Sequence, residues 1–137
     1  MIARIHGAAI AQIPEACLTG VFDPNMASAE RFAREHNVTV YPTMEALLAS
    51  PEVDAVCICT PSGLHASQAI AAMEAGKHMV CEKPMSLTLA DADRMIETAE
   101  RTGVKTCVIS QYRFSDATRE VRRAIQEGAF GRIVSGS

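Results

Sequence analysis

The chain lacks an excess of basic residues: 13 lysines and arginines stand against 16 aspartates and glutamates, which gives a net charge of −3. A nucleic-acid partner held through its phosphates is therefore not expected. No apolar run approaches the roughly 20 residues that a membrane-spanning helix needs. The N-terminus also has no charged segment followed by an apolar one, as a secretory signal would have. These absences predict a protein without a membrane segment.

No two of the five cysteines have the C-x-x-C spacing of a redox or metal-binding motif, and all five lie in apolar, strand-like runs: Cys17, Cys57, Cys59, Cys81 and Cys107. An odd number of cysteines in such runs favours reduced core thiols in a cytoplasmic protein over disulfides. Cys57 and Cys59 would point to one face of a strand, but two sulfurs without nearby ligands make no zinc site. No metal site is expected.

What the sequence does contain is the composition of one globular domain, 48% apolar and 21% charged, in 137 residues. Apolar runs alternate with helical patterns along the whole chain. The pattern predicts strands at 17–22, 38–41, 55–59, 78–81 and 105–110, with a further strand starting at 131–137. It predicts helices at the N-terminus and at 26–36, 44–49, 64–75, from Thr88 to Gly103, and at 116–127. This alternation indicates an α/β fold, a doubly wound parallel sheet of the Rossmann type.

Asp23 follows the first predicted strand and begins the run Asp23-Pro24-Asn25. In dinucleotide-binding folds, an acid at this place accepts hydrogen bonds from the adenosine ribose and repels a 2′-phosphate, which favours NAD over NADP. A simpler interpretation also fits, because Asp and Asn are common in turns that start helices.

The run Thr60-Pro61-Ser62-Gly63-Leu64-His65 joins the most apolar predicted strand to a helix. Backbone N–H groups and hydroxyls at such a junction can hold a pyrophosphate or a ribose. The alternative is a turn with a helix cap. His65, in the first turn of the predicted helix, could contact the cofactor or simply be solvated.

Glu82-Lys83-Pro84 ends the strand at 78–81 and is the sharpest functional signal. A lysine at the carboxyl end of a parallel strand lies where open α/β sheets bind ligands. Lys83 could orient a substrate hydroxyl and help to move its proton. A nearby Glu82 would keep the lysine charged, whereas desolvation would lower its pKa, and the sequence leaves both effects open. The alternative is an ordinary surface pair. A cis peptide bond before Pro84 is one option for this turn.

Gln111 and Arg113 follow the last complete strand, in the run Gln111-Tyr112-Arg113-Phe114. Both could line a ligand cleft, although Arg113 could equally be a plain surface charge. His6, on the first helix, is expected to be structural.

In this order, the motifs resemble those of the Gfo/Idh/MocA family of nicotinamide-dependent sugar and cyclitol dehydrogenases. The resemblance implies an NAD-dependent oxidoreductase, with NADP less likely, acting on a secondary hydroxyl of a sugar, cyclitol or polyol in a cytoplasmic homo-oligomer. It implies Lys83 as the catalytic residue and a cofactor site formed by Ile2, Asp23, Thr60, Pro61, Ser62, His65, Glu82, Lys83, Gln111 and Arg113. The rival hypothesis is a non-catalytic Rossmann-like module for binding or assembly.

Two parts of the family pattern are expected outside the chain. The first strand and its glycine loop would precede Met1, so that residues 1–130 form a partial dinucleotide-binding domain whose first helix begins at Ile2. A substrate domain would follow, with 131–137 as its opening strand. By itself the chain is expected to be an inactive nucleotide-binding fragment.

The missing strand would lie in the centre of the sheet, between the strands that end near Asp23 and Thr60. Its absence leaves a gap of roughly 9–10 Å with two unpaired edges. We expect either direct pairing of these two strands, or a dimer whose partner supplies a strand such as 132–135. Lys83, Thr60 and Asp23 should still lie on one rim of the sheet.

Overall fold

The computed structural model describes residues 2–135 and shows an α/β fold with parallel strands, as predicted. The strands form two sheets. One sheet pairs β1 (Gly20–Val21) with β2 (Thr39–Val40), and the other has the order β3 (Ala55–Ile58), β4 (His78–Cys81), β5 (Thr106–Val108). The five complete strands that the sequence predicts are present in the predicted order, although most are shorter than the apolar runs.

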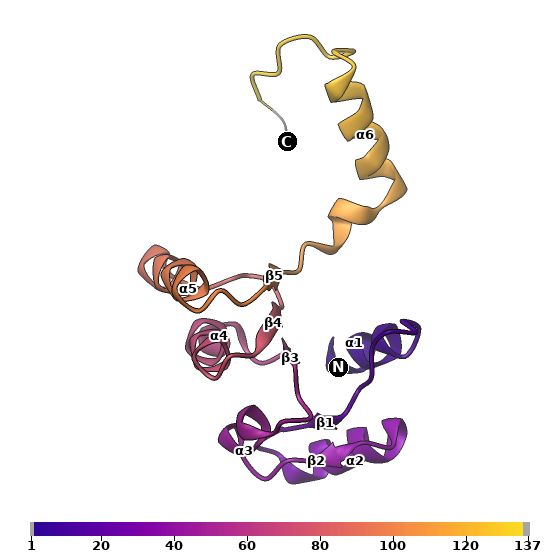
Figure 1. Cartoon of the computed structure of the whole chain (residues 1–137). Helices are drawn as coiled ribbons and strands as arrows, with labels where there is room; N and C mark the ends of the chain where they lie inside the picture. The colour runs from indigo at the N-terminus through magenta and orange to yellow at the C-terminus, as the bar shows by residue number, and fades with distance from the viewer. Residues whose placement is uncertain (1, 136–137) are drawn as a thin grey trace.

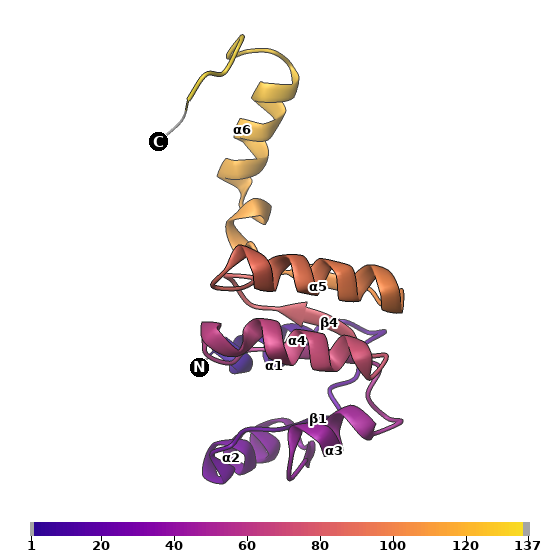
Figure 2. The same ribbon diagram turned by 90° about the vertical axis from the view of Figure 1, so that its left-hand side faces the viewer.

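The predicted helices are also present: α1 (Ile2–Ile10), α2 (Met26–His36), α3 (Met44–Ala49), α4 (His65–Glu74), α5 (Leu89–Thr102) and α6 (Asp116–Gln126). Two short 3₁₀ helices follow β3 and β5: η1 (Ser62–Leu64) and η2 (Gln111–Phe114). Helices α4 and α5 lie on one side of the three-stranded sheet, whereas α1 lies on the other side of β3 (Figures 1 and 2). Helix α6 extends away from the rest of the molecule (Figure 1).

Local capping explains where the helices begin and end. The Asn25 side chain accepts a hydrogen bond from the Ser28 N–H at the start of α2, and Asn37 ends that helix in the left-handed region at φ 54°. At the start of α5, the Thr88 hydroxyl accepts from the Asp91 N–H and donates to the Asp91 carboxylate. Thr88 thus caps the helix, and the run Thr88-Leu89-Ala90-Asp91 resembles a capping box in which the carboxylate accepts from the Thr88 hydroxyl instead of its backbone N–H.

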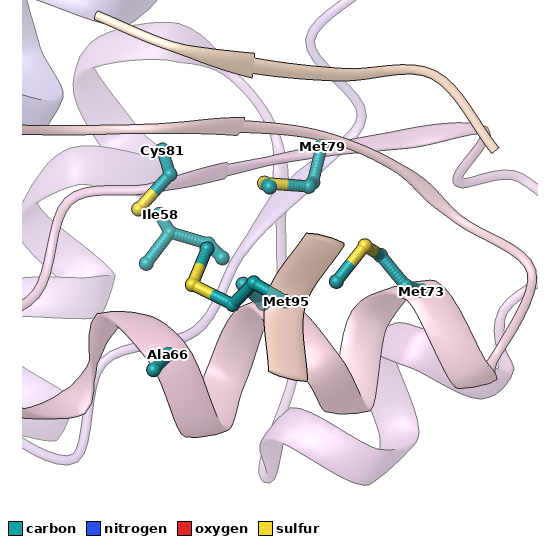
Figure 3. Close-up of a cluster of buried hydrophobic side chains, with 7 residues drawn as sticks. Ile58, Ala66, Met73, Met79, Cys81 and Met95 are labelled. Carbon is teal, nitrogen blue, oxygen red and sulfur yellow. The ribbon is translucent and has the colours of Figure 1, made fainter. Parts of the chain in front are cut away.

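The core lies between α4, α5 and the three-stranded sheet (Figure 3). Met73 and Cys81 are completely buried and Met95 is 1% exposed. Burying one such methionine side chain stabilises the fold by about 1.5–3 kcal/mol. This half of the chain therefore has the packing needed to hold the ends of β3 and β4 in place.

The gap predicted in the sheet is present. The two sheets are separated by a cavity of about 780 Å³, lined by residues of α1, β1 and β3. The predicted direct pairing of β1 with β3 is wrong over the described residues, because the two strands belong to separate sheets. Residues of α1 that include His6 and Gly7 line the cavity, so this helix lies beside the gap. Supply of a strand by a partner chain stays a prediction.

Three other expectations need correction. The continuously apolar run of β3 is the pattern of a parallel strand covered on both faces, but only one face is covered. Ile58 is buried beneath the core, whereas Cys57 on the opposite face is exposed because α4 covers only one side. Of the cysteines, only Cys81 is a core thiol; Cys17, Cys57 and Cys107 are exposed and Cys59 is half-buried. Residues 131–135 form no strand, since no neighbouring edge pairs with them; positions 136–137 lie outside the described residues.

Candidate functional site

The carboxyl ends of β3, β4 and β5 form one rim, because the three strands are parallel and in register, with Ile58 opposite Cys81 and Cys81 opposite Val108. Thr60 follows β3 and Lys83 follows β4, so the two residues leave the sheet on the same side. The prediction that Thr60 and Lys83 share a rim is confirmed; for Asp23 it stays a prediction, because β1 belongs to the other sheet.

His65 joins the two loops that carry Thr60 and Lys83. Its Nε2 lies 2.8 Å from the carbonyl oxygen of Thr60, and its Nδ1 lies 2.7 Å from the carbonyl oxygen of Pro84. The side chain is only 1% exposed. The interpretation of His65 as a solvated residue is therefore wrong; its contact with a cofactor stays a prediction.

A second contact fixes the loop after β3 on its outer side. The Thr60 hydroxyl donates to Oε1 of Gln68 at 2.6 Å. Gln68 lies in the first turn of α4, and sequence reasoning did not single it out. No sequence signal indicated this contact, because Thr60 lies in a loop outside the helix that carries Gln68. Pro61 and Ser62 continue the loop, and Ser62 starts η1.

Glu82 is bound to the first helix. Its Oε1 lies 2.9 Å from Nε2 of His6, and its Oε2 accepts the Lys83 N–H at 3.2 Å. Both carboxylate and imidazole are largely buried, with 12% and 16% of their side chains exposed. The hydrogen bond from His6 lowers the pKa of Glu82, and burial opposes this shift. His6 thus connects α1 to the motif Glu82-Lys83-Pro84. The sequence did not indicate this contact, because 76 residues separate His6 from Glu82.

Lys83 itself is exposed, and its peptide bond to Pro84 is cis. Among the described residues, its ammonium group forms no ion pair with Glu82, whose carboxylate is engaged by His6 and by the Lys83 backbone. The lysine is therefore held by its backbone while its side chain remains available at the rim.

Asp23 is half-buried at the end of the segment that contains β1 and lines the same cavity as Thr60. Its Oδ1 accepts the Asn25 N–H at 2.8 Å, which is the turn that the simpler interpretation predicted. That contact uses one of its two carboxylate oxygens. The turn and a role in holding a ribose are therefore compatible.

The remaining predicted site residues are less closely joined to this cluster. Gln111 and Arg113 are exposed on η2 after β5, and over residues 2–135 neither side chain has a hydrogen bond to Lys83 or Thr60. Ile2 is the first residue of α1, as predicted. The structure therefore brings together Thr60, His65, Glu82 and Lys83, with Asp23 across the cavity.

The thiols near the site are not poised as nucleophiles. Burial raises the pKa of Cys81 to about 11 and that of Cys59 to about 12, so both remain protonated at neutral pH. In the part of the chain that the structure describes, no group of three His, Cys, Asp or Glu side chains is arranged to hold a metal ion. Within the same residues, no helix has both the length and the apolar character of a membrane span.

Comparison with known proteins agrees with this geometry. The family model described as an oxidoreductase family with an NAD-binding Rossmann fold matches residues 1–110. The chain is 41% identical over 112 residues to a 1,5-anhydro-D-fructose reductase of Ensifer adhaerens, covering 79% of this chain and 34% of that protein. It is 32% identical to a myo-inositol 2-dehydrogenase of Thermotoga maritima, covering 96% and 40%.

A solved structure is similar over almost the whole chain. The WlbA dehydrogenase of Bordetella pertussis, in complex with NADH and UDP-GlcNAcA, superposes with a TM-score of 0.92 at 35% identity, covering 96% of this chain and 40% of that one. The chain thus spans between a third and two fifths of the length of these relatives.

Proposed function

Because this chain belongs to the Gfo/Idh/MocA oxidoreductase family, whose model describes an NAD-binding Rossmann fold, we propose that residues 1–130 are the nucleotide-binding part of an NAD-dependent dehydrogenase. Its substrate would be a secondary hydroxyl of a sugar, cyclitol or related polyol. Residues 131–137 would begin a substrate domain. The observation that carries the proposal is the rim on which Thr60 and Lys83 lie side by side, with Asp23 across the cavity.

The proposed cofactor position follows from the charges around the cavity. Asp23 would accept hydrogen bonds from the adenosine ribose through the oxygen that the turn leaves free, and its negative charge disfavours the 2′-phosphate of NADP. The segment Thr60–Ser62, with His65 behind it, would lie along the pyrophosphate and the second ribose. Glu82, Gln111 and Arg113 would complete the nicotinamide side.

Lys83 would act on the reacting hydroxyl. Oxidation of a secondary alcohol breaks one C–H bond and one O–H bond: the hydride goes to the nicotinamide, and the proton leaves through a positioned group. An exposed lysine with a fixed backbone can hold the hydroxyl and pass on that proton. When bound, the cofactor supplies the hydride acceptor, which none of the side chains of this chain could supply.

The chain covers only part of the length of its relatives, and this determines which activities we expect of residues 1–137 by themselves. Relatives are about two and a half times as long, so we propose that this segment binds NAD weakly and turns over no substrate. We place the whole protein in the cytoplasm, as a homo-oligomer with reduced thiols. The competing function is a non-catalytic module for binding or assembly, which the unpaired edges of β1 and β3 favour.

Titration with NADH separates the two functions. Nicotinamide fluorescence of the wild-type chain should rise to saturation, and Asp23→Ala should weaken binding about tenfold or more, because it removes the ribose contact. Asp93→Ala, on the exposed side of α5, is the matched control and should bind like the wild type. If no saturable signal appears at millimolar protein concentration, the module hypothesis is favoured. Equal weakening by both variants would show that Asp23 has no specific role.

A further inference from the structure

His65 has two partners of the same kind. Its two ring nitrogens lie 2.7 Å and 2.8 Å from the carbonyl oxygens of Pro84 and Thr60, respectively. The ring is 1% exposed, so water cannot take the place of either partner. Each contact is at normal hydrogen-bonding distance.

A carbonyl oxygen only accepts hydrogen bonds, whereas a neutral imidazole has one N–H donor and one bare nitrogen that accepts. A neutral His65 would therefore direct a nitrogen lone pair at a carbonyl oxygen at hydrogen-bonding distance, whichever tautomer it adopted. An imidazolium ring donates to both oxygens. We propose that His65 is doubly protonated and clamps the loops after β3 and β4, and that it is thereby a positioning residue for Lys83. Only the last step, the consequence for Lys83, rests on the proposed function.

The surroundings of His65 are consistent with a protonated ring whose charge is compensated by the two carbonyl groups of Thr60 and Pro84. Burying a charge is unfavourable unless hydrogen bonds compensate it, and bonds from a charged donor are stronger than neutral ones. Of the ionisable groups close in sequence to Thr60 and Pro84, Glu82 is engaged by His6 and by the Lys83 N–H. The thiols Cys59 and Cys81 stay neutral because burial raises the pKa of each. The two carbonyl oxygens are therefore the groups that stabilise the His65 proton.

The clamp determines which parts of the rim move together. Pro84 is adjacent to Lys83, and Thr60 begins the segment proposed to lie along the pyrophosphate. One rigid ring between their carbonyl groups fixes the distance between the lysine backbone and that segment. The ring thus connects the two loops directly, in addition to their connection through the sheet.

Another histidine of the same chain supplies an internal reference. Nδ1 of His78 accepts the Lys105 N–H at 3.1 Å, so this nitrogen carries no proton. The chain contains four histidines, which keeps a spectrum of ring nitrogens simple. The structure thus predicts, in one sample, protonated ring nitrogens for His65 and an unprotonated Nδ1 for His78.

The test is nitrogen NMR of the wild-type chain with labelled histidine at pH 7. Both nitrogens of His65 should give signals of protonated ring nitrogens, while Nδ1 of His78 gives the signal of an unprotonated one. An unprotonated signal from either nitrogen of His65 overturns the proposal. This result does not depend on NADH, so it stands or falls separately from the proposed function.

Two variants then test the clamp itself. His65→Phe keeps a ring but no donor, so the backbone amide signals of both loops, at Thr60 and at Lys83, should shift. His65→Gln carries its N–H donors on a single nitrogen, which can reach only one of the two carbonyl oxygens, so it should restore the amide signals of at most one loop. His78→Phe is the control and should move neither. If His65→Phe shifts only one loop, the ring is not a clamp; if this variant does not fold, His65→Gln and the wild-type spectrum still decide.

Discussion

Nε2 of His6 and Oε1 of Glu82 lie 2.9 Å apart and join the first helix to the turn after β4, although 76 residues separate them in the sequence. The contact is largely buried and orients the carboxylate that precedes Lys83. It therefore ties the position of α1 to the signature motif and makes both sensitive to the protonation of Glu82.

The first prediction concerns stability in acid. The pKa of Glu82 is lowered in the folded chain, so its ionised form contributes stability that is complete above the unfolded pKa of about 4.3. This contribution is lost as the pH falls through the lower, folded pKa. Glu82→Gln should therefore lose less stability than the wild type between neutral and acid pH, measured as urea midpoints. Glu97→Gln, at an exposed position on α5, should follow the wild type; if it also flattens the profile, Glu82 is not the responsible group.

The second prediction concerns the other partner of this contact. His6→Ala leaves the largely buried Glu82 carboxylate without its main donor, and we expect a loss of about 1–3 kcal/mol in the free energy of unfolding. His36→Ala removes a half-buried ring on α2 that lies against Phe32. This control should not change the pH profile in acid, whereas His6→Ala should. A profile for His6→Ala that matches the wild type would contradict the importance of the contact.

A third prediction tests Lys83 in a longer protein that joins these residues to a substrate domain. Lys83→Ala should lower kcat by about 10²–10⁴-fold, the usual contribution of general acid–base catalysis. NADH affinity should change little, because binding comes mainly from the adenosine half. Lys105→Ala, exposed before β5 at the opposite end of the sheet, is the control. A near-normal kcat for Lys83→Ala would make this lysine a surface residue.

The core is the subject of the fourth prediction. Met73 is completely buried between α4 and the sheet, and Met73→Ala should reduce the free energy of unfolding by about 2–5 kcal/mol. Met26→Ala, at a position that is 47% exposed, should cost far less. Urea unfolding of both variants measures the difference. Similar losses would show that the packing around Met73 is not what holds this half together.

The fifth prediction concerns the edges of β1 and β3 beside the cavity. Residues 132–135 are exposed, apolar at Ile133 and Val134, and unpaired with either sheet. We predict that in a dimer one copy supplies this segment as a strand to its partner. Light scattering should show a dimer that Val134→Asp weakens, whereas Leu89→Asp, at an 85% exposed position on α5, does not. A monomer whose β1 and β3 amides exchange rapidly would refute this pairing.

Much of the fold could be predicted because its signals are local. Helix α2 begins and ends where Asn25 and Asn37 indicate, and β4 has the predicted bounds 78–81, because caps and apolar runs act within a few residues. The common rim of Thr60 and Lys83 also follows from parallel strands. None of these inferences requires knowledge of distant contacts.

The contacts that complete the site could not be predicted in this way. His65 lies in the first turn of a helix, where side chains are often solvated, and only the meeting of two strand ends places carbonyl oxygens on both sides of its ring. His6 and Glu82 meet for the same reason. The exposure of Cys57 escaped prediction because an apolar strand does not reveal which of its faces a helix covers.

The division into two sheets also has a consequence for cooperativity. With no ladder of hydrogen bonds between β1 and β3, the segment around β1 and β2 can open without breaking the sheet that carries Lys83, as a separate unit of local unfolding. A ligand that touches Asp23 on one side and Thr60 on the other would bind only when both units are closed. Such a ligand would merge two unfolding transitions into one, so that the dinucleotide would serve as a structural link between the two halves of the chain.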